Sequence, residues 1–136
     1  MSITRAMSSL ILLVLSIATV VDAHARKDLP PESPTDSELA LLPQACHARL
    51  RGGKEEHAAW RQKIGRGNFD HLHHYCFALN YINRARFTFD KKAKRYFLQR
   101  ADGNLDYVLR HWPQNSPLRP DAEAGKRQVQ MMMRTL

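Results

Sequence analysis

The clearest pattern in the chain is a stripe of apolar residues at spacings of three and four over residues 68–87, which includes Phe69 and Leu72. This spacing places apolar side chains on one face of a helix, so it predicts an amphipathic helix that packs against a core. A second stripe with the same spacing covers residues 90–112, and Pro113 marks its end. The two stripes predict a pair of long helices in the second half of the chain.

The remaining patterns are shorter and broken. They predict a helical turn over residues 39–42 capped by Asp36 or Ser37, helices over residues 43–51 and 55–64 that each end at glycines, and a terminal helix over residues 123–136. Asp102-Gly103-Asn104 could form a turn instead of continuing the second long helix, because glycine costs about 1 kcal/mol in a helix interior. No alternation of apolar and polar residues typical of a strand occurs. We therefore predict an all-α fold, with one helical domain over residues 38–136 and a helical hairpin at residues 68–113.

The first 25 residues have the pattern of a secretory signal peptide. A positive charge at Arg5 precedes a 12-residue apolar run, and the small-residue pattern Ala23-His24-Ala25 follows it. The run is shorter than the roughly 20 helical residues that cross a hydrocarbon core, and an uncleaved anchoring helix is the alternative interpretation. We expect cleavage after Ala25, export to the periplasm, a flexible proline-rich leader over residues 26–37 and no transmembrane segment in the mature chain.

Two cysteines, Cys46 and Cys76, are present in the chain. In a small exported protein they are most simply explained as a disulfide that staples the core. That bond would close a loop of 30 residues and contribute roughly 3 to 4 kcal/mol. Two buried free thiols are the alternative.

Three segments of the hairpin resemble exported tetratricopeptide-type proteins of proteobacteria that carry a His-His-Tyr-Cys segment. The segments are Phe69-Asp-His-Leu-His-His-Tyr-Cys76, Leu79-Asn-Tyr-Ile-Asn-Arg84 and Leu105-Asp-Tyr-Val-Leu-Arg-His-Trp-Pro113. The resemblance covers about half of the chain and implies a helical-hairpin repeat without catalytic residues. The chain departs from the repeat pattern between its two helices, where 22 residues separate Leu79 from Ala101 and a repeat of about 34 residues leaves room for only about 9.

Histidines gather near the start of the first long helix. His71 and His74 share one helix face at a spacing of three, whereas His73 shares another face with Cys76. A zinc site needs at least three converging ligands, so His47 would have to join His71 and His74 to form one. The alternative is that His74 forms a hydrogen bond inside the hairpin. The chain has no Cys-x-x-Cys-His segment and no glycine-rich phosphate loop, so we predict no cofactor and no enzymatic activity.

Positive charge is concentrated in residues 84–100, which contain seven basic residues and one acidic residue, in a chain whose net charge is +8. Aromatic residues interleave with these charges, a composition that suits an anionic membrane surface, an acidic protein or a polyanion. An ordinary solvated helix face is the alternative, and export disfavours nucleic acid. The residues that we predict for the contact surface are Tyr81, Arg84, Lys91, Lys92, Lys94, Arg95 and Trp112.

These patterns favour an exported, non-enzymatic helical interaction module that docks a protein partner. The first alternative is a periplasmic metal-binding protein that uses His47, His71 and His74. The second is a small cationic protein that binds anionic components of the cell envelope.

Overall fold

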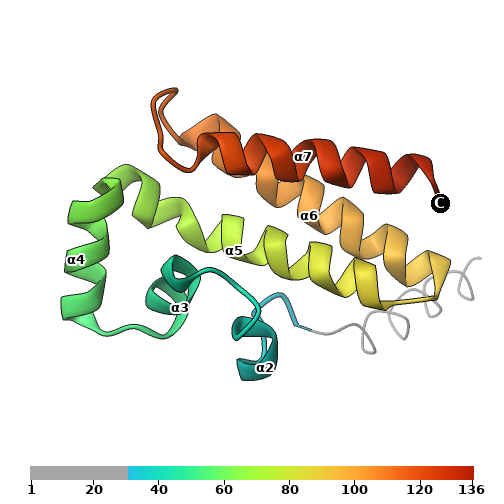
Figure 1. Ribbon diagram of the computed structural model, residues 1–136, viewed down its shortest axis with the longest axis horizontal. Helices are drawn as coiled ribbons and strands as arrows, with labels where there is room; N and C mark the ends of the chain where they lie inside the picture. Colours follow the sequence, from blue (N-terminus) through green and yellow to red (C-terminus); the bar gives the residue numbers. More distant parts are fainter. Residues whose placement is uncertain (1–30) are drawn as a thin grey trace, which may run out of the picture. The chain divides into compact units, whose positions relative to one another are not determined.

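The structure, a computed structural model, describes residues 31–136, and this range forms six helices and no strand (Figure 1). Three of the helices are short: α2 (Asp36–Leu39), α3 (Gln44–Arg51) and α4 (Lys54–Ile64). The other three are long: α5 (Arg66–Phe87), α6 (Lys91–His111) and α7 (Arg119–Arg134). The all-α fold predicted from the sequence is confirmed. The predicted signal peptide, its cleavage after Ala25 and the first part of the leader lie outside the described residues.

Helices α5 and α6 form the predicted antiparallel hairpin and share the largest interface of the domain (Figure 1). Their facing sides bury apolar residues at the spacings of three and four seen in the sequence. The buried apolar side chains of these two helices include Phe69, Leu72, Ala78, Ile82, Ala85, Phe97, Leu98, Ala101, Leu105 and Val108. This interface carries most of the hydrophobic core.

Helix α6 runs without a break through Asp102-Gly103-Asn104, where the sequence alone left a turn open. The neighbouring residues Ala101, Asn104 and Leu105 are all buried. Packing of this turn against α5 outweighs the roughly 1 kcal/mol that glycine costs in a helix interior. Helix α5 begins two residues earlier than predicted, directly after Gly65, whose φ of 89° lets the chain turn sharply out of α4.

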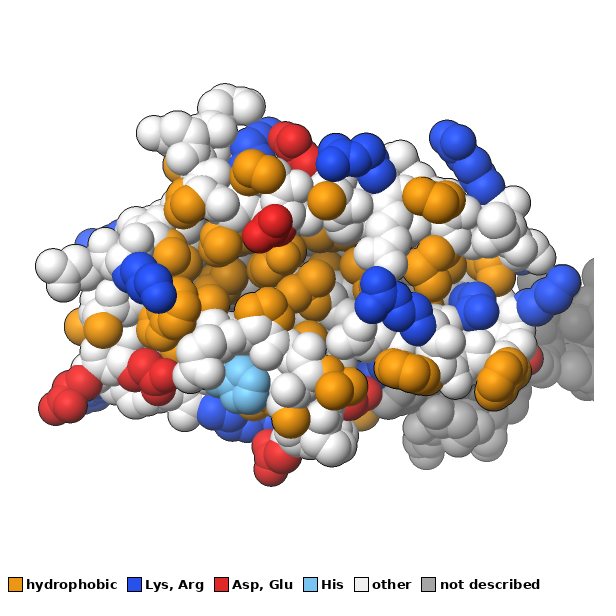
Figure 2. All heavy atoms as spheres, in the orientation of Figure 1, with side chains coloured by type: hydrophobic (Ala, Val, Ile, Leu, Met, Phe, Trp, Pro, Cys, Tyr) orange, Lys and Arg blue, Asp and Glu red, His pale blue; other side chains and the backbone are white. Residues whose placement is uncertain are grey.

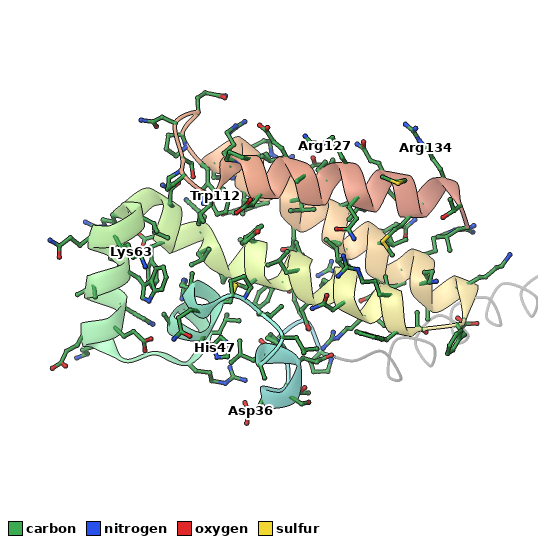
Figure 3. The ribbon with its side chains drawn as sticks, in the orientation of Figure 1. Asp36, His47, Lys63, Trp112, Arg127 and Arg134 are labelled. Atoms are coloured by element: carbon green, nitrogen blue, oxygen red, sulfur yellow. A yellow bond between two sulfur atoms is a disulfide. The ribbon has the colours of Figure 1, made fainter. Side chains whose placement is uncertain are left out.

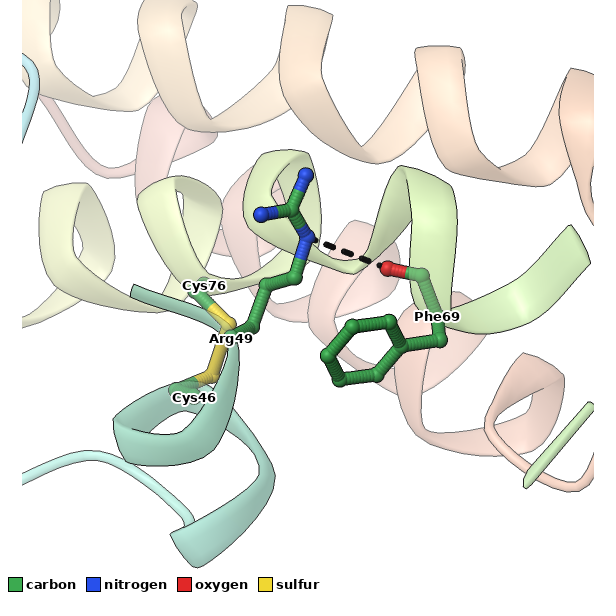
Figure 4. Close-up of a disulfide and its surroundings, with 4 residues drawn as sticks. All are labelled: Cys46, Arg49, Phe69 and Cys76. Atoms are coloured by element: carbon green, nitrogen blue, oxygen red, sulfur yellow. Dashed lines mark hydrogen bonds between the residues drawn. A yellow bond between two sulfur atoms is a disulfide. The ribbon is translucent and has the colours of Figure 1, made fainter. Parts of the chain in front are cut away.

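Helix α3 is bonded to the side of α5 that carries Cys76 (Figure 4). The predicted disulfide between Cys46 and Cys76 is confirmed, with the two Cα atoms 5.5 Å apart. One turn further along α3, the Nε of Arg49 donates a hydrogen bond to the carbonyl oxygen of Phe69 at 3.2 Å. The disulfide and this hydrogen bond together fix α3 on the first half of α5.

Helix α2 lies against the same side of α5, closer to its end. It begins after Thr35, which is the N-cap and forms a capping box with Glu38. The prediction that Asp36 or Ser37 caps this helix was wrong. The carboxylate of Glu38 also accepts two hydrogen bonds from Arg84 of α5, at 2.6 and 2.9 Å. These bonds hold the pKa of Glu38 down at about 2. The last residues of the predicted leader therefore belong to the packed domain.

Helix α7 packs mainly on α6, and Ala122, Gly125 and Val129 are its buried residues. It begins at Arg119, four residues earlier than predicted, because Pro120 is tolerated in the first turn of a helix. The guanidinium of Arg119 donates to the carbonyl oxygens of Leu109 and Trp112 at the end of α6, both at 3.1 Å. Within residues 31–136, none of the helices combines the length and the apolar character that crossing a membrane requires.

Candidate binding surface

Three of the residues predicted for the contact surface are buried, and this corrects the expectation that they meet a partner directly. Tyr81, Trp112 and Arg84 are only 1%, 3% and 8% exposed. The ring of Tyr81 stacks on that of Phe97, and the indole N–H of Trp112 donates to the carbonyl oxygen of Asn68 at 3.1 Å. Trp112 lies at the far end of the hairpin from the α5–α6 turn (Figure 3). These three side chains hold the domain together.

The largest exposed aromatic side chains lie instead in the turn between α5 and α6. Phe87, the last residue of α5, is 75% exposed, and Phe89 is 99% exposed. Helix α5 ends because Thr88 is extended, and α6 begins directly after its N-cap Asp90, whose carboxylate accepts a hydrogen bond from the N–H of Ala93 at 2.6 Å. The short connection leaves both phenylalanine rings outside the core.

Basic residues flank these two phenylalanines in the sequence. Arg86, Lys91, Lys92 and Arg95 are exposed and Lys94 is half-buried. None of the five forms an ion pair within the described range. We call residues 86–95 the basic turn. Four residues predicted for the contact surface, Lys91, Lys92, Lys94 and Arg95, belong to it.

Acidic residues of the basic turn do not balance its positive charge. Asp90 is its one acidic residue, and the carboxylate of Asp90 caps α6. The space-filling view shows Lys and Arg side chains next to hydrophobic ones at the end of the molecule where α5 stops (Figure 2). The C-terminal part of α7, with Arg134, reaches the same end (Figure 3). The arrangement combines apolar rings that can be buried with cations that can meet an anionic surface.

Phe87 and Phe89 were not among the predicted contact residues, although the sequence contained a signal for them. Phe87 is the last residue of the range predicted for the first long helix, and Phe89 falls between the two stripes. A large apolar residue at such a position lies outside both packed faces. The limits of the two stripes thus pointed to the turn that carries both rings.

The histidines do not converge on a metal-binding arrangement. His71 and His74 face α6, where Nδ1 of His74 lies 2.7 Å from Oδ1 of Asn104 and Nδ1 of His71 lies 3.3 Å from the hydroxyl of Tyr107. His47 belongs to α3, which is bonded to a different side of α5 (Figure 3). The part of the chain that the structure describes holds no group of three or more His, Cys, Asp or Glu residues suited to a metal ion. The trio of His47, His71 and His74 that the alternative interpretation required is therefore not formed, and His74 makes the hydrogen bond inside the hairpin.

His73 lies on the α3 side, where its Nδ1 is 3.3 Å from Nη2 of Arg49. Burial lowers the pKa of His73 to about 4, and the nearby His74 and Arg49 add to this effect. Burial also lowers the pKa of His71, with a contribution from His111. The lowered pKa of each ring favours its neutral form, which suits packing and hydrogen bonding.

Comparisons of the chain with protein-family models, with curated proteins and with solved structures found no significant match. The resemblance to tetratricopeptide-type proteins stays a prediction from the sequence.

Proposed function

We propose that this chain is a non-enzymatic helical module that acts outside the cytosol and docks on an anionic membrane surface through the basic turn. The observation that carries the proposal is the exposure of Phe87 and Phe89, 75% and 99%, between basic side chains that form no ion pair with the residues that the structure describes. Aromatic rings that enter the lipid interface, flanked by cations that meet anionic headgroups, are a recognised means of peripheral membrane binding.

The expected energies support a reversible attachment. A basic residue close to an anionic membrane contributes about 1 kcal/mol, so the five basic residues of the turn contribute about 5 kcal/mol. Complete burial of a phenylalanine side chain contributes about 1.5 to 3 kcal/mol, and partial insertion contributes less. Neither contribution alone gives stable anchoring, whereas their sum reaches roughly micromolar affinity.

The compartment is also part of the proposal. The disulfide between Cys46 and Cys76 supports an oxidising environment, where such bonds form and persist. The sequence favoured a protein partner, but two of the aromatic residues expected to meet that partner, Tyr81 and Trp112, are packed inside the domain. The exposed rings at the turn favour a lipid surface over a shaped protein interface.

The test is co-sedimentation of the purified, disulfide-bonded protein with vesicles. One set contains phosphatidylcholine alone and the other contains phosphatidylcholine with phosphatidylglycerol. We expect binding to the anionic vesicles only, with an affinity that falls steeply as salt rises. Equal binding to both sets, or binding to neither, would contradict the proposal, and an acidic protein partner would then be the next candidate.

Two pairs of variants separate the turn from the rest of the surface. Phe87→Ala/Phe89→Ala should weaken binding about 30-fold, which corresponds to roughly 2 kcal/mol. The matched control is Leu41→Ala/Met131→Ala, since these side chains are 63% and 64% exposed but lie outside the basic turn. We expect the control to bind like the wild type.

Charge reversal provides the second pair. Lys91→Glu/Lys92→Glu changes two exposed residues of the basic turn, and Lys54→Glu/Arg127→Glu makes the same change in total charge on α4 and α7. The first variant should bind far more weakly than the second. Equal losses would mean that only the net charge of the protein matters.

A further inference from the structure

A separate surface of the hairpin carries a cleft of about 290 Å³. Its walls come from α6, with Arg100, Gly103 and Asn104, from His74 of α5, and from Glu32 in the segment before α2. None of these residues belongs to the basic turn. The function proposed above does not use the cleft.

A carboxylate already lies in this cleft. Oε1 of Glu32 accepts a hydrogen bond from Nη2 of Arg100 at 2.7 Å and a longer one from Nδ2 of Asn104 at 3.4 Å. A guanidinium and an amide N–H are donors suited to a carboxylate. The cleft therefore has the chemistry to hold an acidic side chain.

The amide donor is held in place before any ligand arrives. Asn104 is buried, and its Oδ1 can only accept, so Nδ1 of His74 donates the 2.7 Å hydrogen bond between them. This bond turns Nδ2 of Asn104 toward the carbonyl oxygen of Arg100, 3.0 Å away, and toward the cleft. The ring of His74 is itself held by Tyr107, with the two ring centroids 3.8 Å apart. The donor geometry does not depend on Glu32.

Gly103 keeps the cleft open. It lies in the middle of α6, yet its φ is not positive and a Cβ atom built on it would meet nothing within 4 Å. Neither backbone conformation nor close packing requires glycine here, although glycine weakens a helix interior. The missing side chain leaves room beside Arg100 and Asn104.

The contacts of Glu32 are weak enough for its carboxylate to leave the cleft. The ion pair between Glu32 and Arg100 is half-exposed on both sides, and such pairs are weak. Two residues further on, Pro34 is buried and its carbonyl oxygen accepts a hydrogen bond from Nη2 of Arg51 at 3.1 Å. Glu32 can thus move out of the cleft while Pro34 stays anchored.

We infer that this cleft is a binding site for an acidic residue of a partner peptide, and that Glu32 occupies it as an internal competitor. The partner segment carries a glutamate or aspartate that pairs with Arg100 and Asn104 and displaces Glu32. The site is independent of the membrane-binding turn, so either proposal can fail without the other.

The test measures peptide binding by NMR titration of the full, disulfide-bonded protein. The probe is a blocked Pro-Pro-Glu-Ser-Pro peptide, the sequence of residues 30–34, and its control has Gln in place of Glu. In the Glu32→Ala variant the Glu peptide should bind at least about three-fold more tightly than in the wild type, because a tethered competitor has a millimolar effective concentration. It should also bind about ten-fold more tightly than the Gln peptide, and the side-chain amide signals of Asn104 should shift.

Two further variants test the cleft itself in the Glu32→Ala background. Gly103→Leu fills the space beside Arg100, whereas Gly103→Ala adds only one methyl group to the same open helix position. We expect the leucine variant to lose peptide binding and the alanine variant to keep it, with both helices intact by circular dichroism. Equal binding of the Glu and Gln peptides, or equal binding by the two Gly103 variants, would overturn the inference.

Discussion

Removal of the disulfide between Cys46 and Cys76 should cost the domain a large part of its stability. The bond links residues 30 apart in the sequence, and the loss of loop-closure entropy in the unfolded chain gives about 3.6 kcal/mol for a loop of that length. Small domains have total unfolding free energies of about 5 to 15 kcal/mol. Both cysteines are fully buried, so the bond also fixes α3 on α5 at a point that solvent does not reach.

The measurement is urea unfolding followed by circular dichroism, with Cys46→Ala/Cys76→Ala compared to the oxidised wild type. For a urea dependence of about 2 kcal/mol per molar, the midpoint should fall by nearly 2 M. The single variants Cys46→Ala and Cys76→Ala are the controls. Each should lose about as much as the double variant, because either change removes the whole cross-link.

A loss below about 1 kcal/mol would refute this reasoning. It would mean that the hydrogen bonds of Arg49 and the packing of α3 on α5 already hold these helices together in the unfolded ensemble. Single variants that lose much less than the double variant would refute it as well, since the effect would then come from packing of the side chains.

Three other changes have defined outcomes. The pKa of Glu38 is about 2 in the folded protein and 4.5 in the unfolded chain, so its carboxylate stabilises the fold above pH 4.5 and this contribution is lost as the pH falls toward 2. Glu38→Gln should therefore make the stability measured by thermal unfolding depend less on pH in the acid range. Trp112→Phe removes the indole hydrogen bond to Asn68 and should cost about 1 to 3 kcal/mol in urea unfolding, and an unchanged midpoint would contradict a role in closing the hairpin. Gly103→Ala should stabilise the wild-type protein by about 0.5 to 1 kcal/mol, and destabilisation would show a contact that the structure lacks.

The helical hairpin and the disulfide could be predicted from the sequence because the patterns that indicate them are local. Apolar residues at spacings of three and four fix a helix face wherever glycine and proline are absent, as over residues 68–87. Two cysteines in a small chain leave one pairing, and that pairing is the one observed. The sequence could not predict that α6 continues through Gly103, because this continuity depends on packing against α5.

The failure at Arg84 has a specific physical cause, which differs from that at Tyr81, a residue buried against Phe97 of α6. The sequence shows one apolar stripe along α5, and it gives no sign that a polar residue such as Arg84 is also covered. A second face of the same helix, with Cys76, Asn80 and Arg84, is covered by α2 and α3. Burial of this face depends on where the short helices α2 and α3 pack, and the periodicity of apolar residues along α5 does not show this. Residues that look like the polar face of an isolated helix are therefore interior residues of this domain.

This coverage also explains why the exposure of Phe87 and Phe89 is informative. Helix α5 is covered by neighbours along most of its length, and Tyr81 and Phe97 near the same end are packed against each other. The domain can therefore bury aromatic rings beside the turn, and folding alone does not require apolar residues at positions 87 and 89. Phe87→Ser/Phe89→Ser should leave the unfolding free energy within about 0.5 kcal/mol of the wild type while vesicle binding falls, because these rings make no contribution to the core. A matching loss of stability would instead make them part of the fold.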